Sequence, residues 1–391
     1  MKMQKLGILI IGYKNVKGIN RLLRSLDNVD FLGDEDIDLI FSIDFSGDSS
    51  VEQMANEYIW RYGEKHVQAY RENLGLRTHI LKCGDYLETF HLDAMMVLED
   101  DIYLSPLAYS YMKSAVNYYE GNPQIAGISL YKHEYNIYAR HPFMDYMDGG
   151  DTFFVQYAMS WGQIWMKDAW GDFKEWYNNE AWTKMDTDRI PQNILGWNNS
   201  WLKYHIMYCI DKHKYFVYPR IALTTDFSDP GAHNQTRNTS MQIKLDMCLR
   251  REWHFNDLDN TTAIYDAFFE NEHIKQYLKL DNLEVDLYGV KRYNQNSDYV
   301  LTRRELPYKV VRSWGLFLRP IEANIFSEIE GQDIFLYDMR EKEDEKRAVD
   351  RQLSNRYFEY DLKGINLMTP MTVKYCAGKV IEHIKHRLRV K

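Results

Sequence analysis

The sequence predicts an α/β protein in which helices flank a mostly parallel sheet. Short, mostly apolar runs of strand length, of which Leu6–Gly12 is the first, are usual for strands that are buried on both faces. Segments with apolar residues at helical spacing separate these runs. Strands that alternate with helices in this way form a parallel sheet with helices on both of its faces.

The expected elements follow one another along the first 130 residues. Apolar runs predict strands at Leu6–Gly12, Ile37–Ile43, 94–98 and 125–130. Helical periodicity predicts helices over 19–26, 50–62, 76–90 and 105–119. The last helix starts with Ser105-Pro106, a typical cap followed by a typical first helical residue.

Composition and charge narrow the class of protein. The 48 basic and 57 acidic residues give a net charge of −9, which disfavours a chain-wide nucleic-acid binder. The four cysteines form no Cys-x-x-Cys pair, so we expect neither a zinc module nor disulfides. The longest uncharged run, 152–166, is shorter than the ~20 residues that a membrane-spanning helix needs. We expect a cytoplasmic protein that is soluble or lies on the inner face of the membrane.

Polar residues follow three of the predicted strands, at the sheet edge where such folds bind ligands. Asp44 follows the second strand, where it is either a ligand contact or an ordinary turn or cap residue. Glu99-Asp100-Asp101 follow the third, and three adjacent carboxylates repel one another unless a cation compensates. Mg²⁺ or Mn²⁺ bridging to a phosphate would do so. No P-loop or dinucleotide-binding glycine motif follows the first strand.

The order of these motifs resembles a known family. Gly12-Tyr13, Asp44, Asn73-Leu74-Gly75-Leu76-Arg77 and then Val97-Leu98-Glu99-Asp100-Asp101 resemble glycosyltransferases of the GT-A fold over roughly residues 5–240. The resemblance is to inverting N-acetylglucosaminyltransferase I and to related bacterial polysaccharide glycosyltransferases. It implies a metal-dependent transfer of a hexose or N-acetylhexosamine from a nucleotide sugar, with UDP favoured, to a hydroxyl of a glycan or lipid-linked glycan. Polysaccharide or glycoconjugate synthesis would be the setting.

The resemblance also implies roles in binding metal and donor. Asp101 would bind the Mn²⁺ or Mg²⁺ that bridges the donor diphosphate, and His233 would contact the metal or the diphosphate. Glu99 and Asp100 would hydrogen-bond hydroxyls of the ribose or of the donor sugar.

Other residues would form the nucleotide pocket. Asp44 would accept a hydrogen bond from the nucleobase, and Arg77 would lie near the diphosphate, whose oxygens suit a guanidinium. Gly12 and Tyr13 would line this pocket.

Tryptophans mark the region expected to hold the sugars. Trp161 and Trp165 belong to a Met-Ser-Trp-Gly-x-x-Trp segment and would either present flat faces to sugar rings or lie in the core. Trp197 is a third candidate for stacking.

One departure from the family concerns the catalytic base. The resembling enzymes carry a Trp-Asp pair ahead of a second tryptophan, whereas Asn198 follows Trp197 here. An amide cannot accept a proton from the acceptor hydroxyl as a carboxylate does. Asp151 is the best replacement, with Asp226 and Asp229 as others, and the motif leaves both inverting and retaining mechanisms open.

We expect a catalytic domain over 1–245 and an accessory region over 246–391. The end of the chain, 372–391, contains six basic residues and one acid, and Val380, Ile381, Ile384 and Leu388 fall near one helical face. Such a segment is either a membrane-surface helix or an ordinary helix docked on the protein.

Two other functions remain open. A nucleotidyltransferase that makes a sugar nucleotide uses a similar fold, but it usually has a basic, glycine-rich loop after the first strand, which Gly12-Tyr13-Lys14-Asn15 matches poorly. A catalytically inactive protein that binds sugar nucleotides is the other, because Asn198 stands where a base is expected.

Overall fold

The computed structural model describes residues 4–139, 141–227, 241–249, 251–291 and 297–343, and those of 369–381 other than 371, 375 and 379. The chain forms two compact units, Met1–Glu343 and Asp344–Lys391. None of the described helices is both long enough and apolar enough to span a bilayer.

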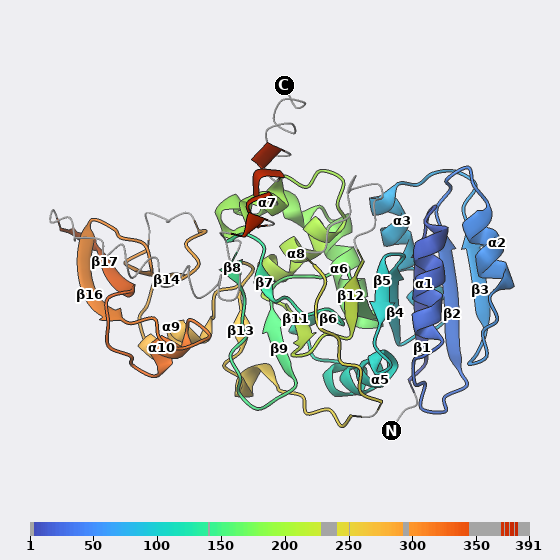
Figure 1. Cartoon of the computed structure of the whole chain (residues 1–391), viewed down its shortest axis with the longest axis horizontal. Helices are drawn as coiled ribbons and strands as arrows, with labels where there is room; N and C mark the ends of the chain where they lie inside the picture. The colour runs from blue at the N-terminus through green and yellow to red at the C-terminus, as the bar shows by residue number, and fades with distance from the viewer. Residues whose placement is uncertain are drawn as a thin grey trace. The chain divides into compact units, whose positions relative to one another are not determined.

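A nine-stranded sheet forms the centre of the first unit, in the order β13-β9-β11-β6-β10-β4-β1-β2-β3 (Figure 1). Its strands are β1 (Leu6–Gly12), β2 (Ile37–Ile43), β3 (Lys65–Ala69), β4 (Ala94–Glu99), β6 (Ile125–Ser129), β9 (Thr152–Val155), β10 (Gln163–Met166), β11 (Tyr215–Pro219) and β13 (Ile264–Tyr265). Most neighbours are parallel, while β10 is antiparallel to β4 and β6, and β9 to β11. The predicted α/β class with a mostly parallel sheet is confirmed.

Helices bury both faces of this sheet. Along β1, Ile8 and Ile10 belong to one hydrophobic cluster, and Leu9 and Ile11 belong to another, because successive side chains point to opposite faces. Residues of α1 (Val16–Leu26), α2 (Ser50–Glu57) and α5 (Ala108–Tyr119) fill the first cluster, and those of α3 (Leu76–Cys83), α6 (Lys167–Asn178) and α8 (Leu202–Asp211) the second. This two-sided burial explains why the strands contain unbroken apolar runs.

All four predicted helices have different bounds in the structure, and α1, expected over 19–26, begins at Val16. The helix expected over 50–62 ends at Glu57. At its end the Lys65 ammonium donates hydrogen bonds to the carbonyls of Ala55, Asn56 and Tyr58 at 2.7–2.9 Å. The helix expected over 76–90 is two helices, α3 and α4 (Tyr86–Thr89), and the one expected from 105 begins at Ala108. Strand β3 was not predicted, because it is a partly exposed edge strand without an apolar run.

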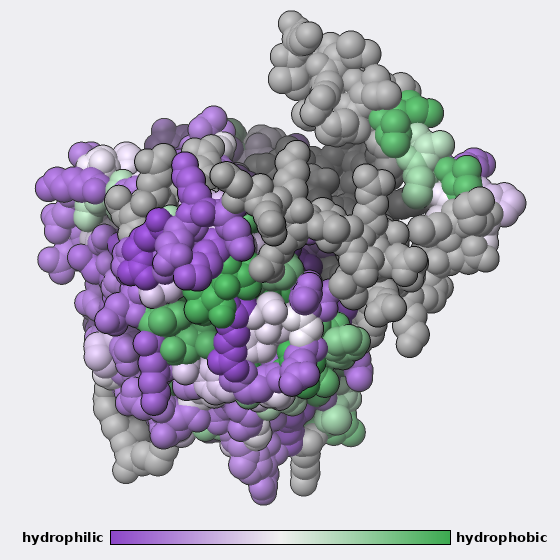
Figure 2. All heavy atoms as spheres, turned by 90° about the vertical axis from the view of Figure 1, so that its left-hand side faces the viewer, coloured by the Kyte–Doolittle hydropathy of each residue, from purple (hydrophilic) through white to green (hydrophobic). Residues whose placement is uncertain are grey.

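A second, four-stranded sheet lies at the β13 end of the first unit, in the order β14-β15-β17-β16. Its elements are β14 (Leu283–Asp286), β15 (Tyr299–Thr302), β16 (Tyr308–Trp314) and β17 (Ile334–Lys342), with α9 (His273–Leu278) and α10 (Ala323–Phe326). The Tyr265 hydroxyl of β13 donates to Glu322 at 2.7 Å and ties the two sheets together. Apolar side chains gather on the face shown in Figure 2, and Val311, Phe317 and Leu318 of this region are exposed.

Short elements complete the first unit. They are β5 (Ile102–Leu104) with β12 (Thr224–Asp226), β7 (Tyr135–Asn136) with β8 (His141–Pro142), α7 (Gln192–Leu195), and 3₁₀ turns at Ala181–Lys184, Thr187–Arg189 and Leu258–Asn260.

Two histidines lie within the aromatic part of the core. His205 stacks on Phe173 with ring centroids 4.2 Å apart, and His133 lies among tyrosine rings. Burial disfavours the charged imidazolium, so it lowers the pKa of each histidine to about 3. Each must therefore be neutral in the folded protein at ordinary pH.

We predict that His205→Phe makes the protein less sensitive to acid. A histidine whose folded-state pKa is lowered contributes stability that is fully present above its unfolded pKa and is lost as pH falls towards the folded value. Between pH 7 and pH 5, His205 should therefore lower the free energy of unfolding of the parent protein by about 2 kcal/mol. The variant, which has no histidine at this position, should not show this loss. Urea denaturation of both proteins at the two pH values measures this. The exposed His213→Asn variant is the control, and an equal loss in all three proteins contradicts the prediction.

Candidate functional site

Four carboxylates gather where β4 ends. Glu99 is the last residue of β4, and Asp100 and Asp101 form the turn into β5. Strand β12 runs antiparallel to β5 with Asp226 opposite Ile102, and the Phe227 amide donates to the Asp101 carbonyl at 2.9 Å. This pairing brings Asp226 to the acidic triplet. From the sequence, Asp226 is only an alternative base, because nothing in the sequence indicates that β5 and β12 pair.

The electrostatics of this acidic cluster suit a divalent cation. Burial, followed by the charges of Asp101, Asp100 and Asp226, raises the pKa of Glu99 well above its usual range. Burial, Asp226 and Asp100 raise the pKa of Asp101 to about 7. The Asp101 Oδ1 atom is buried and has no hydrogen-bond partner among the described residues. Excess negative charge together with an unused carboxylate oxygen is a donor set that fits Mg²⁺ or Mn²⁺.

The end of β1 is attached to the same cluster. Asn15 caps α1 by accepting a hydrogen bond from the Gly18 amide at 2.9 Å, and its Nδ2 donates to Asp100 at 3.1 Å. A Cβ atom on Gly18 would lie 2.3 Å from the Asp100 carbonyl, so only glycine allows α1 to approach this closely. The contact of Asn15 with Asp100 was not predicted, although an asparagine just before a helix is itself a cap signal.

The two predicted pocket residues at the end of β1 lie beside this contact. Gly12 is buried, and a Cβ atom there would meet Ile19 and Val51 at 3.0 Å. Tyr13 is half-buried, and the Lys14 ammonium lies 5.5 Å from its ring centroid.

Asp44 fixes the loop that leads into α3. It is only 5% exposed, and its Oδ1 accepts from the amides of Phe45 at 2.9 Å and Leu74 at 2.8 Å, while its Oδ2 accepts from Gly75 at 3.1 Å. Gly75 has a φ of +74°, which glycine adopts without strain. Asp44 is therefore a turn residue, which was one of its two expected roles. Its contact with a nucleobase stays a prediction.

The first turn of α3 brings two other predicted residues together. The Arg77 guanidinium donates to the backbone carbonyl of Asn198 and lies 4.9 Å from the ring centroid of Tyr204. Asn198 is exposed and Trp197 is half-buried, whereas Trp201 is a core residue. The backbone of Asn198, the residue at the expected base position, is thus hydrogen-bonded to α3, and Asp44 holds the loop that leads into this helix.

The predicted tryptophans differ in their surroundings. Trp161 is half-buried, its ring lies edge-on to Tyr131, and its carbonyl accepts from Thr224 of β12 at 2.6 Å. Trp165 is only 1% exposed and stacks on Trp170 with ring centroids 3.7 Å apart. The expectation that Trp165 stacks on a sugar needs correction, because its ring is packed in the core.

The contacts of Asp151 are of a kind that stabilises the fold. It forms an ion pair with Arg251, which also pairs with Asp246, and it accepts from the His254 amide at 2.8 Å. It precedes β9, which is four strands from β4, or roughly 19 Å at the usual strand spacing. This placement does not favour Asp151 as the base. His233 and Asp229 lie outside the described residues.

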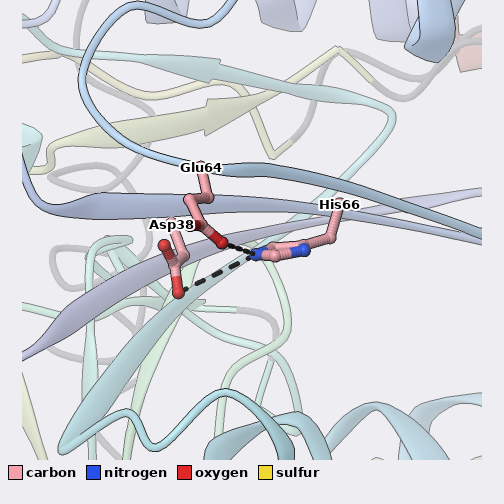
Figure 3. Close-up of side chains that lie close together, drawn as sticks. All are labelled: Asp38, Glu64 and His66. Carbon is pink, nitrogen blue, oxygen red and sulfur yellow. Dashed lines mark ion pairs between the residues drawn. The ribbon is translucent and has the colours of Figure 1, made fainter.

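A second group of ionisable side chains lies at the opposite edge of the sheet (Figure 3). The His66 Nε2 atom is 3.9 Å from Asp38 Oδ2 and 3.7 Å from Glu64 Oε2, and of the described residues only this group has three ligand atoms within 4.8 Å of one another. The Lys5 ammonium already pairs with Asp38 at 2.9 Å. We therefore assign Asp38, Glu64 and His66 to an ion-pair network at the amino ends of β2 and β3, separate from the acidic cluster.

Comparison with known proteins gives only partial similarities. No family model and no curated protein matches the sequence. Among solved structures, the chain is similar to the mannosyltransferase PcManGT from Pyrobaculum calidifontis in complex with GDP-Man and Mn²⁺, with a TM-score of 0.30 and 10% identity over 43% of this chain and 46% of that one. It is also similar to S. aureus TarS 1-349, with a TM-score of 0.35 and 12% identity over 56% of this chain and 59% of that one. The chain thus spans about half the length of the structures that it matches.

We predict that Asp44→Ala loosens the loop over residues 73–75. The change leaves three amides without their acceptor, and an unsatisfied buried donor costs about 1–3 kcal/mol. Hydrogen exchange measured by mass spectrometry should show faster exchange, by about tenfold or more, in peptides that contain Leu74 and Gly75. Asp48→Ala is the matched control, because among the described residues the Asp48 carboxylate accepts hydrogen bonds only from Ser50. Equal exchange in both variants would show that Asp44 does not hold this loop.

Proposed function

We propose that the chain is a metal-dependent glycosyltransferase that moves a sugar from a nucleotide donor, with UDP favoured, to a hydroxyl of a glycan acceptor. The acidic cluster of Glu99, Asp100, Asp101 and Asp226 carries this proposal. It lies at the carboxyl edge of the parallel strands, where folds of this class bind ligands, and burial together with the neighbouring carboxylates raises the pKa values of Glu99 and Asp101. The resemblance of the motifs around it to GT-A glycosyltransferases supports the same conclusion.

In this proposal, each chemical group of a nucleotide-sugar donor has residues of this chain that would bind it. Asp101 and Asp226 would hold the cation, and Glu99 and Asp100 would bind donor hydroxyls. Asp44 has used three of its roughly four lone-pair positions on backbone amides, so one acceptor position remains for a base N–H. Arg77 has a buried Nε without a hydrogen-bond partner among the described residues, which suits a phosphate oxygen.

The reaction would place an acceptor hydroxyl against the anomeric carbon of the donor. A cation bound at the acidic cluster would offset the charge that builds on the departing nucleoside diphosphate. The surrounding side chains orient the two substrates, and a base must remove the hydroxyl proton. Asn198 stands where the resemblance expects that base in the sequence, and its backbone carbonyl accepts from Arg77. Trp161 is the predicted tryptophan near β12 that retains an accessible surface.

The structure provides an observation against nucleotidyl transfer. A basic, glycine-rich loop would be expected between β1 and α1, but Asn15 there caps α1 and bonds to Asp100. An inactive binder of sugar nucleotides remains the second candidate, because Asn198 is an amide. Repeated release of nucleoside diphosphate in the presence of an acceptor distinguishes an enzyme from such a binder.

We predict that Asp101→Ala abolishes Mn²⁺-dependent binding of the donor without unfolding the protein. A thermal-shift series with UDP-sugars and GDP-sugars, with and without Mn²⁺, identifies the ligand first. A ligand at 100 times its dissociation constant adds ~2.7 kcal/mol of stability, and the variant should lose that gain. Glu64→Gln, in the ion-pair network at the other edge, is the control and should keep it. If Glu64→Gln loses the Mn²⁺ effect while Asp101→Ala keeps it, the metal has been assigned to the wrong edge.

We predict that Asn198→Asp raises turnover by ~10²-fold, the usual contribution of a general base. Donor affinity should hardly change, because the base acts on the acceptor. Asp151→Asn should mainly lower the melting temperature, since it weakens the pair with Arg251. Release of nucleoside diphosphate at saturating donor and acceptor measures both variants. A ~10²-fold loss in folded Asp151→Asn, with no gain in Asn198→Asp, would transfer the role of the base to Asp151.

A further inference from the structure

Helices α3 and α8 both begin at the carboxyl edge of the large sheet. Helix α3 follows the loop that Asp44 holds at the end of β2. Helix α8 leads through a short turn into β11, which is parallel to β6, and β6 and β4 are both antiparallel to β10. Since α8 runs against the direction of β11, its first turn lies at the edge where β4 ends. The positive ends of both helix dipoles are therefore at the same edge as the acidic cluster.

Each of these helices carries a cation at its second residue, and both cations donate to the chain at or just beyond the end of α7. The Lys203 ammonium of α8 donates to the Leu195 carbonyl at 2.8 Å. The Arg77 guanidinium of α3 donates to the Asn198 carbonyl and lies 4.9 Å from the ring centroid of Tyr204, which follows Lys203. Two cations from distant parts of the sequence thus converge on one short segment.

Within the part of the chain that the structure describes, no carboxylate balances these two cations. Arg77 and Lys203 donate only to the two backbone carbonyls, neither forms an ion pair, and the buried Nε atom of Arg77 has no acceptor. Neither helix has an acidic residue or a side-chain cap in its first turn, where a cation is unfavourable. Burial and the charge of Arg77 lower the pKa of Lys203. An anion bound between the two side chains would relieve all of these costs.

We propose that Lys203 and Arg77 together form a binding site for a phosphate group. A guanidinium presents a planar fork of N–H donors and an ammonium a compact charge, and both suit phosphate oxygens. A terminal phosphate carries a charge of about −1.5 to −2 at pH 7 and three acceptor oxygens, so one group can bond to both cations, whereas a carboxylate brings a single charge. Because backbone carbonyls already hold both side chains, little side-chain freedom is lost when the phosphate binds.

The phosphate belongs either to the diphosphate of a nucleotide donor or to a phosphate group on the acceptor. The choice between these two sources rests on the proposed function. Binding of the anion itself does not, because this site requires neither Mn²⁺ nor sugar transfer. If phosphate binding fails here while Mn²⁺-dependent donor binding holds, only the role of Lys203 and Arg77 is lost.

The test is calorimetric titration of the full chain with inorganic pyrophosphate, in EDTA and at low salt. The parent should bind, and Lys203→Gln or Arg77→Gln should each weaken the affinity by about tenfold or more, the effect of losing one hydrogen bond to a charged group. Lys203→Arg keeps the charge and should bind more tightly than Lys203→Gln. Lys212→Gln is the matched control, because it removes the lysine that follows the other end of α8 and pairs there with Asp211 at 3.3 Å. It should bind like the parent.

A second titration, with UDP and GDP in the presence of Mn²⁺, identifies the source of the phosphate. If the site holds the donor diphosphate, Lys203→Gln should weaken binding of the nucleotide by the same factor as binding of pyrophosphate. If it holds a phosphate of the acceptor, the variant should bind the nucleotide like the parent and still lose pyrophosphate. The proposal is overturned if the parent does not bind pyrophosphate at low salt. It is also overturned if Lys203→Gln has a lower melting temperature but binds pyrophosphate as tightly as Lys212→Gln, since Lys203 would then only stabilise the end of α7.

Discussion

The concentration of negative charge at the end of β4 is the constraint on which the rest of the site depends. Glu99, Asp100 and Asp101 follow one another in the chain, and the pairing of β5 with β12 adds Asp226. Burial and the neighbouring carboxylates raise the pKa values of Glu99 and Asp101, so the charged forms of these two groups repel their surroundings and take up protons more readily. A cation relieves the same repulsion without protonation. We propose that such a cation also bridges to a ligand with phosphate groups.

The sheet supplies the rigid frame for this charge. Because both faces of β1, β2 and β4 are buried, the register of these strands is strongly specified, and their carboxyl ends meet along one edge. Each end is then fixed by a polar contact: Asn15 connects the end of β1 to Asp100, and Asp44 holds the loop before α3. Through α3 that second contact reaches Arg77 and Asn198. Packing in the core thus determines where polar groups meet at the edge.

The sequence predicts the parts of the fold that depend on local pattern. The strands β1, β2, β4 and β6 are apolar runs, and the acidic triplet and Asp44 follow two of them, so their shared edge could be inferred. The approach of Asp226 to Asp101 and of Asn198 to Arg77 could not be inferred, because both arise from contacts between distant segments. Trp165 illustrates a third case. Its residue type and spacing suit both a sugar platform and the core, and only its stacking on Trp170 decides between them.

The two charged groups at opposite edges show why proximity alone is a poor guide to a metal site. Asp38, Glu64 and His66 lie close together, and the Lys5 ammonium pairs with Asp38 and offsets its charge. In the acidic cluster no three ligand atoms lie within 4.8 Å of one another, although all four of its residues belong to the described part of the chain. Uncompensated carboxylates repel, and they approach one another only when a cation or a proton is added. The stronger indication of a metal site is therefore a set of carboxylates whose charges raise the pKa of one another, and by that criterion we propose that the ion binds at Asp101 and Asp226.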